Sequence, residues 1–162
     1  MKLNVTIAER LKGLFIDGHW ITDTNYKELL SDTTKEMAVA RIPNLNSLAE
    51  LTYHINYYLS GLNNVFKGGD LEIRDKYSFD ITPIETEEDW QKMVHGLINN
   101  AEEFISHVSS MSEENLHGPF IVKKYGSYLR NIEGVIEHAY YHLGQMVIIK
   151  KIIQRNLKWS SS

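Results

Sequence analysis

Apolar residues recur every three or four positions along three long stretches of this chain, which is the spacing of one face of an α-helix. The clearest of these stretches consists of Trp90, Met93, Val94, Leu97, Ile98, Ala101, Phe104, Ile105 and Val108. The same spacing predicts helices over about residues 47–66 and about residues 127–156. Strand-like alternation is brief and is confined to residues 71–79. The chain is therefore expected to be all-α.

Short polar and glycine motifs indicate where helices begin and end. Ser47 and Glu50 have the form of a capping box, in which each side chain accepts a hydrogen bond from a backbone N–H at the helix start. Thr33 and Glu36 have the same form, and Gly68-Gly69 predicts the end of the helix that begins near residue 47.

The first part of the chain is the least regular. A helix is expected over about residues 6–15, followed by an interruption at residues 17–20 and further helical stretches at residues 25–30 and after residue 33.

Four helical segments of this kind predict a four-helix bundle, because amphipathic helices bury their apolar faces against one another. Pro43, Pro83 and Pro119 separate four stretches that contain no other proline. Residues 67–86 are long enough to cross the bundle and join two parallel helices, but residues 111–126 are long enough too, so length alone leaves the topology open. We expect residues 1–158 to form a single domain and residues 159–162 to form a frayed tail.

Composition excludes several classes of function. The 162 residues include no cysteine, so disulfides, thiolate ligands and cysteine nucleophiles are excluded, and any metal must be bound by nitrogen and oxygen. A net charge of -4 gives no overall basic surface for nucleic acid. No apolar run is long enough for a membrane span or typical of a signal peptide, so we expect a cytoplasmic protein with no membrane partner. A local basic group is expected to complement the C-terminal dipole of the last helix, and it consists of Lys150, Lys151, Arg155 and Lys158.

Among the residue types of this sequence, histidine points most clearly to a chemical function. His138 and His142 are four residues apart, so they lie about 40° apart on one helix face and can converge on one metal ion. His54 has the same position at the border of the apolar face of its own helix. Each of the three could instead be a hydrogen-bonded core histidine, and spacing alone leaves both interpretations open. The remaining histidines are expected to be solvated or in loops and to have no role: His19, His95, His107 and His117.

Other metal and nucleophile motifs are incomplete in this sequence. A di-iron bundle needs two Glu-x-x-His motifs, and only Glu114 and His117 provide one, directly before Gly118-Pro119. Ala139 follows His138, so the glutamate of a His-Glu-x-x-His protease is missing. Phosphate-binding glycine loops and Gly-x-Ser-x-Gly are absent. A site of three histidines with open coordination remains.

Around these histidines the sequence resembles the DinB-like family of metalloenzymes. The resemblance is carried by Ser-Leu-Ala-Glu-Leu-Thr-Tyr-His over residues 47–54 and by His-x-x-x-His-x-Gly-Gln over residues 138–145, and it extends loosely over the whole chain. It implies an up-down-down-up bundle in which residues 67–86 are a long crossover between the second and third helices. It also implies a divalent ion, commonly zinc or nickel, on His54, His138 and His142, and a homodimer formed through the bundle faces.

The resemblance also implies a small-molecule substrate, which for some family members is a low-molecular-weight thiol. Three neutral imidazoles leave the ion's charge uncompensated and one position open, so bound water or a bound thiol can become the nucleophile. The first hypothesis is accordingly a metal-dependent hydrolase or thiol S-transferase whose nucleophile is metal-bound water or thiolate rather than a side chain. The alternative is a non-enzymatic, metal-binding, homodimeric, stress-related binding module.

Three further expectations concern the surroundings of the site. Glu50 and Asn131 lie on helix faces from which they could orient the imidazoles. Gly134 and Gly144 are unfavourable within a helix, so we expect another helix of the bundle or of a partner subunit to approach them closely. A group of tyrosines could line a pocket or a dimer face, although ordinary packing explains them as well: Tyr53, Tyr57, Tyr58, Tyr140 and Tyr141.

Overall fold

A computed structural model describes residues 2–160, with side chains through residue 156, and this part of the chain is all-helical, as the sequence predicts. The α-helices are α1 (Leu3–Lys12), α2 (Tyr26–Ser31), α3 (Lys35–Val39), α4 (Leu48–Phe66), α5 (Glu87–Ser110), α6 (Glu113–His117) and α7 (Tyr128–Ser160). A π-helical turn at Gly13–Asp17 follows α1, and 3-10 turns occur at Asp75–Tyr77 and Lys123–Tyr125. None of the described helices combines the length and the apolar character needed to cross a membrane.

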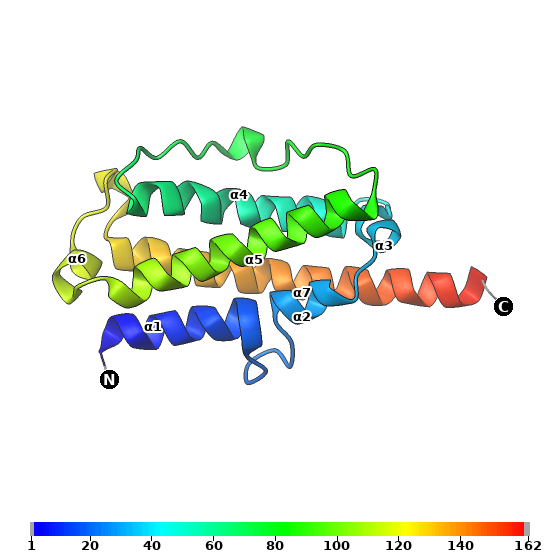
Figure 1. The fold of residues 1–162 in the computed structure, drawn as a ribbon, viewed down its shortest axis with the longest axis horizontal. Helices are drawn as coiled ribbons and strands as arrows, with labels where there is room; N and C mark the ends of the chain where they lie inside the picture. Colours follow the sequence, from blue (N-terminus) through cyan, green and yellow to red (C-terminus); the bar gives the residue numbers. More distant parts are fainter. Residues whose placement is uncertain (1, 161–162) are drawn as a thin grey trace.

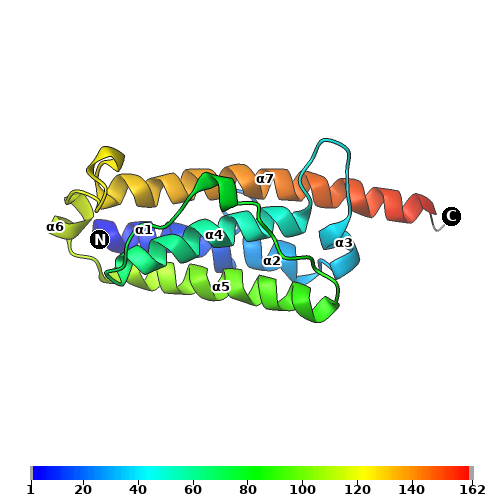
Figure 2. The ribbon, with the colours of Figure 1, turned by 90° about the horizontal axis from the view of Figure 1, so that it is seen from above.

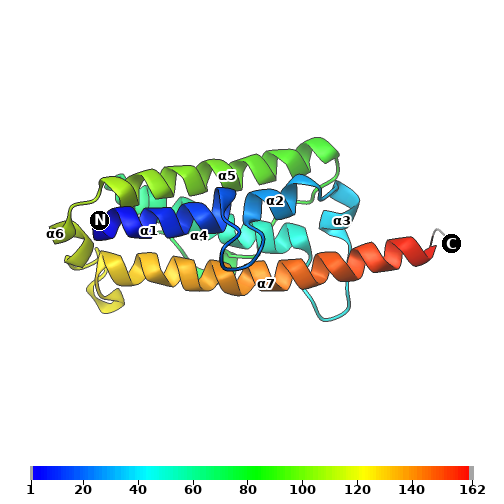
Figure 3. The same cartoon turned by 90° about the horizontal axis from the view of Figure 1, so that it is seen from below.

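The four longest helices lie along one another (Figure 1). α1 and α7 run in one direction, and α4 and α5 run in the opposite direction. The segment over residues 67–86, called the crossover below, returns along the length of α4, so that α4 and α5 are parallel (Figure 2). α5 packs against both α4 and α1, and α4 also packs against α7. α1 and α2 follow each other along one side of the molecule (Figure 3).

The apolar faces predicted from the sequence form the core. On α5, the side chains of Trp90, Leu97, Ala101, Phe104 and Val108 are fully buried. Full burial of an aliphatic or aromatic side chain contributes about 1.5–3 kcal/mol to folding, so this face alone anchors α5 to its neighbours.

The helix-end motifs are confirmed for α4. The Ser47 hydroxyl accepts a hydrogen bond from the Glu50 N–H, and the Glu50 carboxylate accepts one from the Ser47 N–H. At the other end Gly68 has a φ of 90°, which favours glycine, and the Gly68 and Gly69 N–H groups donate to carbonyls of the last turn.

The capping box predicted at Thr33 is wrong. The N-cap of α3 is Thr34, whose hydroxyl accepts the Met37 N–H, while the Thr33 hydroxyl donates to the Leu29 carbonyl. Thr33 therefore belongs to the end of α2, and the helix start shifts by one residue. A capping box that we did not predict begins α5, where Thr86 pairs with Asp89.

The irregular first segment is anchored to α7. The Gly18 N–H closes the π-helical turn by donating to the Gly13 carbonyl, and a Cβ on Gly18 would lie 2.4 Å from the Gly13 Cα, so only glycine fits there. After the turn, the buried Tyr26 stacks on Phe15 and its hydroxyl donates to the Ala139 carbonyl at 2.7 Å. This contact lies one residue from His138.

The strand-like alternation at residues 71–79 produces a docked extended segment rather than a strand. The side chains of Leu71 and Ile73, which are two residues apart, both pack against the core, and no neighbouring strand is present among the described residues. Gly61 of α4 makes room for this segment, because a Cβ there would lie 2.4 Å from Ile73 Cγ1. The alternation thus reflects one face packed on α4.

One residue of the basic group near the end of α7, Lys150, has a different role from the one expected. Lys150 is only 8% exposed, and its ammonium group donates to the Leu29 carbonyl and to the Asp32 carboxylate. It therefore connects the end of α2 to α7.

The Lys158 side chain lies outside the described part. α7 includes residues 159 and 160 of the expected tail, and residues 161–162 are outside the described residues.

Candidate metal centre

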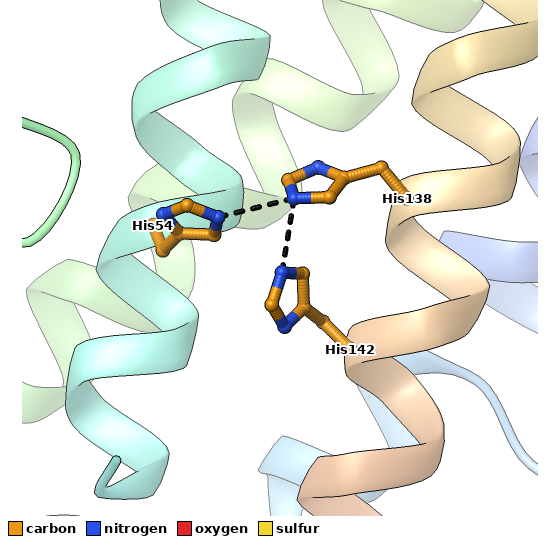
Figure 4. A group of neighbouring side chains, drawn as sticks. All are labelled: His54, His138 and His142. Atoms are coloured by element: carbon orange, nitrogen blue, oxygen red, sulfur yellow. Dashed lines mark hydrogen bonds between the residues drawn. The ribbon is translucent and has the colours of Figure 1, made fainter. Parts of the chain in front are cut away.

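Two helices bring three histidines together (Figure 4). His54 extends from α4 towards His138 and His142 of α7, which lie one helical turn apart. The Nε2 atom of His138 lies 3.1 Å from Nε2 of His54 and 2.9 Å from Nε2 of His142. His54 and His142 are only 6% and 7% exposed, and His138 is half-buried. The sequence-derived triad is thus one cluster in space, with a potential ligand atom from each residue within 4.8 Å of the others.

Backbone and side-chain oxygens position two of the rings through their other nitrogen. The Nδ1 atom of His54 lies 3.2 Å from the Ser78 carbonyl oxygen, and the Nδ1 atom of His142 lies 2.7 Å from Oε1 of Gln145. Because these oxygens only accept hydrogen bonds, Nδ1 carries the proton in both rings. In the neutral state, Nε2 of His54 and of His142 therefore presents a lone pair to His138.

Neither residue expected to orient the imidazoles contacts them. The Glu50 carboxylate binds Arg41 and the Ser47 cap, and the Asn131 amide donates to two carbonyls of residues that precede α7. The groups that do so are Ser78 and Gln145. Ser78 lies in the crossover, where the sequence carries no signal for it, whereas Gln145 is three residues after His142 and shares its helix face.

Burial lowers the pKa of all three histidines. The pKa of His138 falls to about 4, mainly because burial disfavours the charged ring and also because His142 and His54 are close. Burial also lowers the pKa of His54, with a further contribution from His142, and it lowers the pKa of His142. The three rings are consequently neutral near pH 7, which is the state that binds metal ions.

The donor set fits a divalent cation. His138 Nε2 can carry one proton and donate it to one neighbouring ring, so the lone pair of the other ring stays without a donor within the cluster. A cation bound by all three nitrogens would satisfy both lone pairs. The Nε2 separations are also close to the about 3.3 Å expected between two nitrogens that each lie about 2.0 Å from a tetrahedral zinc ion. Imidazole nitrogens are suitable ligands for zinc, nickel and copper.

Aromatic side chains enclose one side of the cluster. Phe79 of the crossover stacks on the His54 ring, with centroids 4.2 Å apart. Tyr58 contacts the edges of the His54 and His138 rings, and its hydroxyl donates to Asp75 at 2.8 Å. Burial and the Asp75 carboxylate raise the pKa of Tyr58 to about 12, so the phenol remains protonated.

The other histidines stay apart from the cluster. His19, His95 and His117 are exposed. His117, which is expected in a loop, is instead the last residue of α6. His107 differs from its expected solvated state, because its ring is half-buried against Phe66.

A cavity of about 550 Å³ lies beside His138, between α4, the crossover and α7. Gly134 lines this cavity, and a Cβ there would meet only Arg130 Nη1, at 3.8 Å. A Cβ on Gly144 would have no neighbour within 4 Å. The close approach of another helix of the same bundle, expected at both glycines, is therefore wrong; Gly134 borders empty space and Gly144 faces outward.

Comparison with known proteins identifies the family. Neither the curated proteins nor the solved structures give a match to this chain. The model of the DinB superfamily matches residues 22–146, which include α4, the crossover, α5 and all three clustered histidines. Since this match spans most of the sequence, the chain belongs to the DinB superfamily.

Proposed function

We propose that this protein is a divalent-metal-dependent enzyme in which His54, His138 and His142 bind an ion that activates water or a thiol. The proposal is supported by the convergence of Nε2 atoms from three neutral imidazoles. The lone pairs of His54 and His142 both face His138, which can donate only one proton. Zinc or nickel is the expected ion, because both accept imidazole ligands. The proposal takes residues 1–158 as one up-down-down-up four-helix bundle in which the crossover joins the second and third long helices.

Three protein ligands favour catalysis over a purely structural role. Structural zinc sites usually have four protein ligands, whereas catalytic sites use three and leave a position for water or substrate. A divalent ion in such a site lowers the pKa of water or of a thiol bound to it. The proposed reaction is therefore hydrolysis or thiol S-transfer, and because the chain has no cysteine, any thiol must come from a substrate.

We propose a separate role for each of the residues around the cluster. The Ser78 carbonyl and Gln145 hold two imidazoles in the binding tautomer. Phe79 and Tyr58 limit water access from the side of the crossover. Asp75 lines the neighbouring cavity and is hydrogen-bonded to Tyr58, so its carboxylate is placed to accept a proton from a substrate bound there.

The proposal is tested by metal analysis followed by an activity screen. Protein purified without chelator, and metal-free protein reloaded with zinc or nickel, should contain one ion per chain. His142→Ala should lose the ion, whereas the exposed His95→Ala should keep it. The loaded protein is then screened with esters, amides, and thiols paired with electrophiles. Turnover that disappears in His142→Ala supports an enzyme, and a stoichiometric ion with no turnover on any of these substrates contradicts it.

A non-enzymatic, metal-binding homodimer is the second candidate. It is favoured by exposed apolar residues on α7, where Tyr141 is 64% and Ile148 is 61% exposed, with Gly144 on the same face between them. A second copy packed here would bury these side chains and would account for the glycine. Light scattering coupled to size exclusion should give twice the chain mass for the native protein and the single-chain mass for Ile148→Glu; a native monomer would contradict the dimer.

A further inference from the structure

We propose that the substrate of this site is an amphipathic anion, with its apolar body in the cavity beside His138 and its anionic group at Arg130. This inference rests on the proposed function, because it takes the end of the cavity at His138 to be the reacting end. It adds the chemical class of the ligand and the residues that select it.

One face of α7 forms the floor of the cavity. Arg130, Gly134 and His138 all line it and are spaced by four residues, so they follow one another along the same helix face. The Arg130 side chain extends along this floor, because its Nη1 lies 3.2 Å from Glu137 Oε2 and would lie 3.8 Å from a Cβ on Gly134. The guanidinium is therefore located over the floor of the cavity, beside Gly134.

Gly134 leaves room for that ligand. Glycine is unfavourable in a helix interior relative to alanine, and no packed helix among the described residues requires it here. Because Gly134 lines the cavity, any larger side chain at this position would project into it. The glycine is thus explained by an empty volume that a ligand can occupy.

The walls of the cavity suit an apolar body. They include Leu62 of α4, Leu71 and Ile73 of the crossover, Phe120, and Val135 of α7. The volume of about 550 Å³ lies within the range of about 300–1,000 Å³ that is typical of small-molecule sites. Mainly aliphatic walls of this kind favour an alkyl or aryl chain.

Charged groups around the cavity favour an anionic ligand. The Arg130 guanidinium lies beside Gly134 on the cavity floor, and Lys124 lies over the ring of Tyr125, which also lines the cavity. Arg130 contacts Glu137 through Nη1 at 3.2 Å, and the guanidinium has further N–H groups that can bind a carboxylate. The Asp75 carboxylate is hydrogen-bonded to Tyr58, whose ring contacts His138, so it would repel an anion on that side of the cavity in the metal-free protein. The anionic group is therefore expected at Arg130, with the apolar body against the aliphatic walls.

The test uses two probes of the same shape, 6-phenylhexanoate and its neutral amide, titrated by calorimetry into metal-free and zinc-loaded protein. We expect the carboxylate to bind the native protein in both states. Gly134→Leu should weaken binding of both probes at least tenfold while helix content and the melting temperature are maintained or rise. Arg130→Gln should weaken only the carboxylate, at least fivefold, and Lys92→Gln, which removes an exposed cation on α5, should change neither probe.

The outcomes separate this inference from the proposed function. If the protein binds zinc but neither probe binds, or if Gly134→Leu and Arg130→Gln bind the carboxylate like the native protein, the inference is overturned while the metal site stands. If no metal binds but the probes still depend on Gly134 and Arg130, the ligand class stands and the metal-dependent function fails.

Discussion

At the scale of single residues, His138 is the centre of the site. Its Nε2 is the atom that both other imidazoles approach, while its pKa is depressed to about 4 by burial and by those neighbours. A buried polar atom that lacks a partner is costly to a protein, and here two lone pairs compete for one proton. In the metal-free chain one of these lone pairs therefore lacks a hydrogen-bond donor within the cluster, and a bound cation would satisfy both.

Gln145 is expected to act by holding the His142 ring. In Gln145→Ala the hydrogen bond to Nδ1 is lost, so the ring can rotate and its tautomer is no longer fixed. Loss of such a supporting contact typically lowers metal affinity about 10–100-fold. Competition with a zinc-binding dye measures this loss. Gln91→Ala on α5, whose amide bonds only Glu87 in the described structure, is the control and should bind zinc as the native protein does.

The metal-free protein should become less stable in acid because of these histidines. Their pKa values are lower in the folded chain than the usual 6.5, so the unfolded state binds more protons as the pH falls. Their contribution is complete above about pH 6.5 and is lost as the pH falls towards 4. Between pH 7 and pH 4, the unfolding free energy of the native protein in urea should fall more than that of His138→Gln, which lacks one of the titrating rings; an equal fall in both would contradict the assigned pKa shift.

At the scale of secondary structure, the site depends on the crossover as much as on the helices. Ile73 packs into the space left by Gly61, the Tyr57 hydroxyl accepts the Arg74 N–H, and the Ser78 carbonyl reaches His54. These contacts fix an extended segment that has little regular structure of its own.

A side chain at position 61 should therefore displace the crossover from α4. Gly61→Val would place methyl groups where Ile73 now lies, and overpacking of this kind costs about 1–3 kcal/mol of unfolding free energy. Hydrogen exchange should increase in residues 71–80 before it increases in α5. Gly96→Ala is the matched control, since its Cβ would meet only Asn56 at an ordinary 3.6 Å; it should be neutral or stabilising. Unchanged exchange in the crossover of Gly61→Val would contradict this packing.

The link between α2 and α7 gives a second prediction at this scale. Tyr26→Phe keeps the stack on Phe15 but removes the buried hydrogen bond to the Ala139 carbonyl. We expect a loss of about 1 kcal/mol in unfolding free energy, as is usual for one buried hydrogen bond. Chemical denaturation measures it, and a variant as stable as the native protein would show that this hydroxyl does not hold the first segment on α7.

The helices could be predicted from the sequence because their signals are local. The apolar spacing on α5 and the capping box at Ser47 involve residues within a few turns of each other. The pairing of His138 with His142 could be predicted for the same reason, because both lie on one face of α7. Spacing alone does not establish that His54 joins them, because that contact links two distant helices; the resemblance to the family implies it. Ser78, Phe79 and the buried Lys150 could not be predicted, because their roles depend on backbone carbonyls and rings that the chain brings close from distant segments.

At the scale of the whole molecule, the parallel pair α4 and α5 is held by polar contacts as well as by the core. The Asn63 amide donates to the Asn100 carbonyl, and the Asn100 amide donates to Asn56 Oδ1. Hydrogen bonds of this kind within an interface require a defined register. With α5 fixed, the crossover must return along α4, and that path carries Ser78 and Phe79 to His54. The arrangement of these helices therefore places crossover residues at the proposed metal centre.

We propose that His54, His138 and His142 together bind one divalent ion and leave a position open. X-ray absorption spectroscopy of the zinc-loaded protein tests this, because the scattering from imidazole rings can be counted. We expect three imidazole nitrogens at about 2.0–2.1 Å and at least one further light ligand that is exchangeable. Two or fewer imidazoles, a fourth ligand from the protein, or no bound zinc would contradict it.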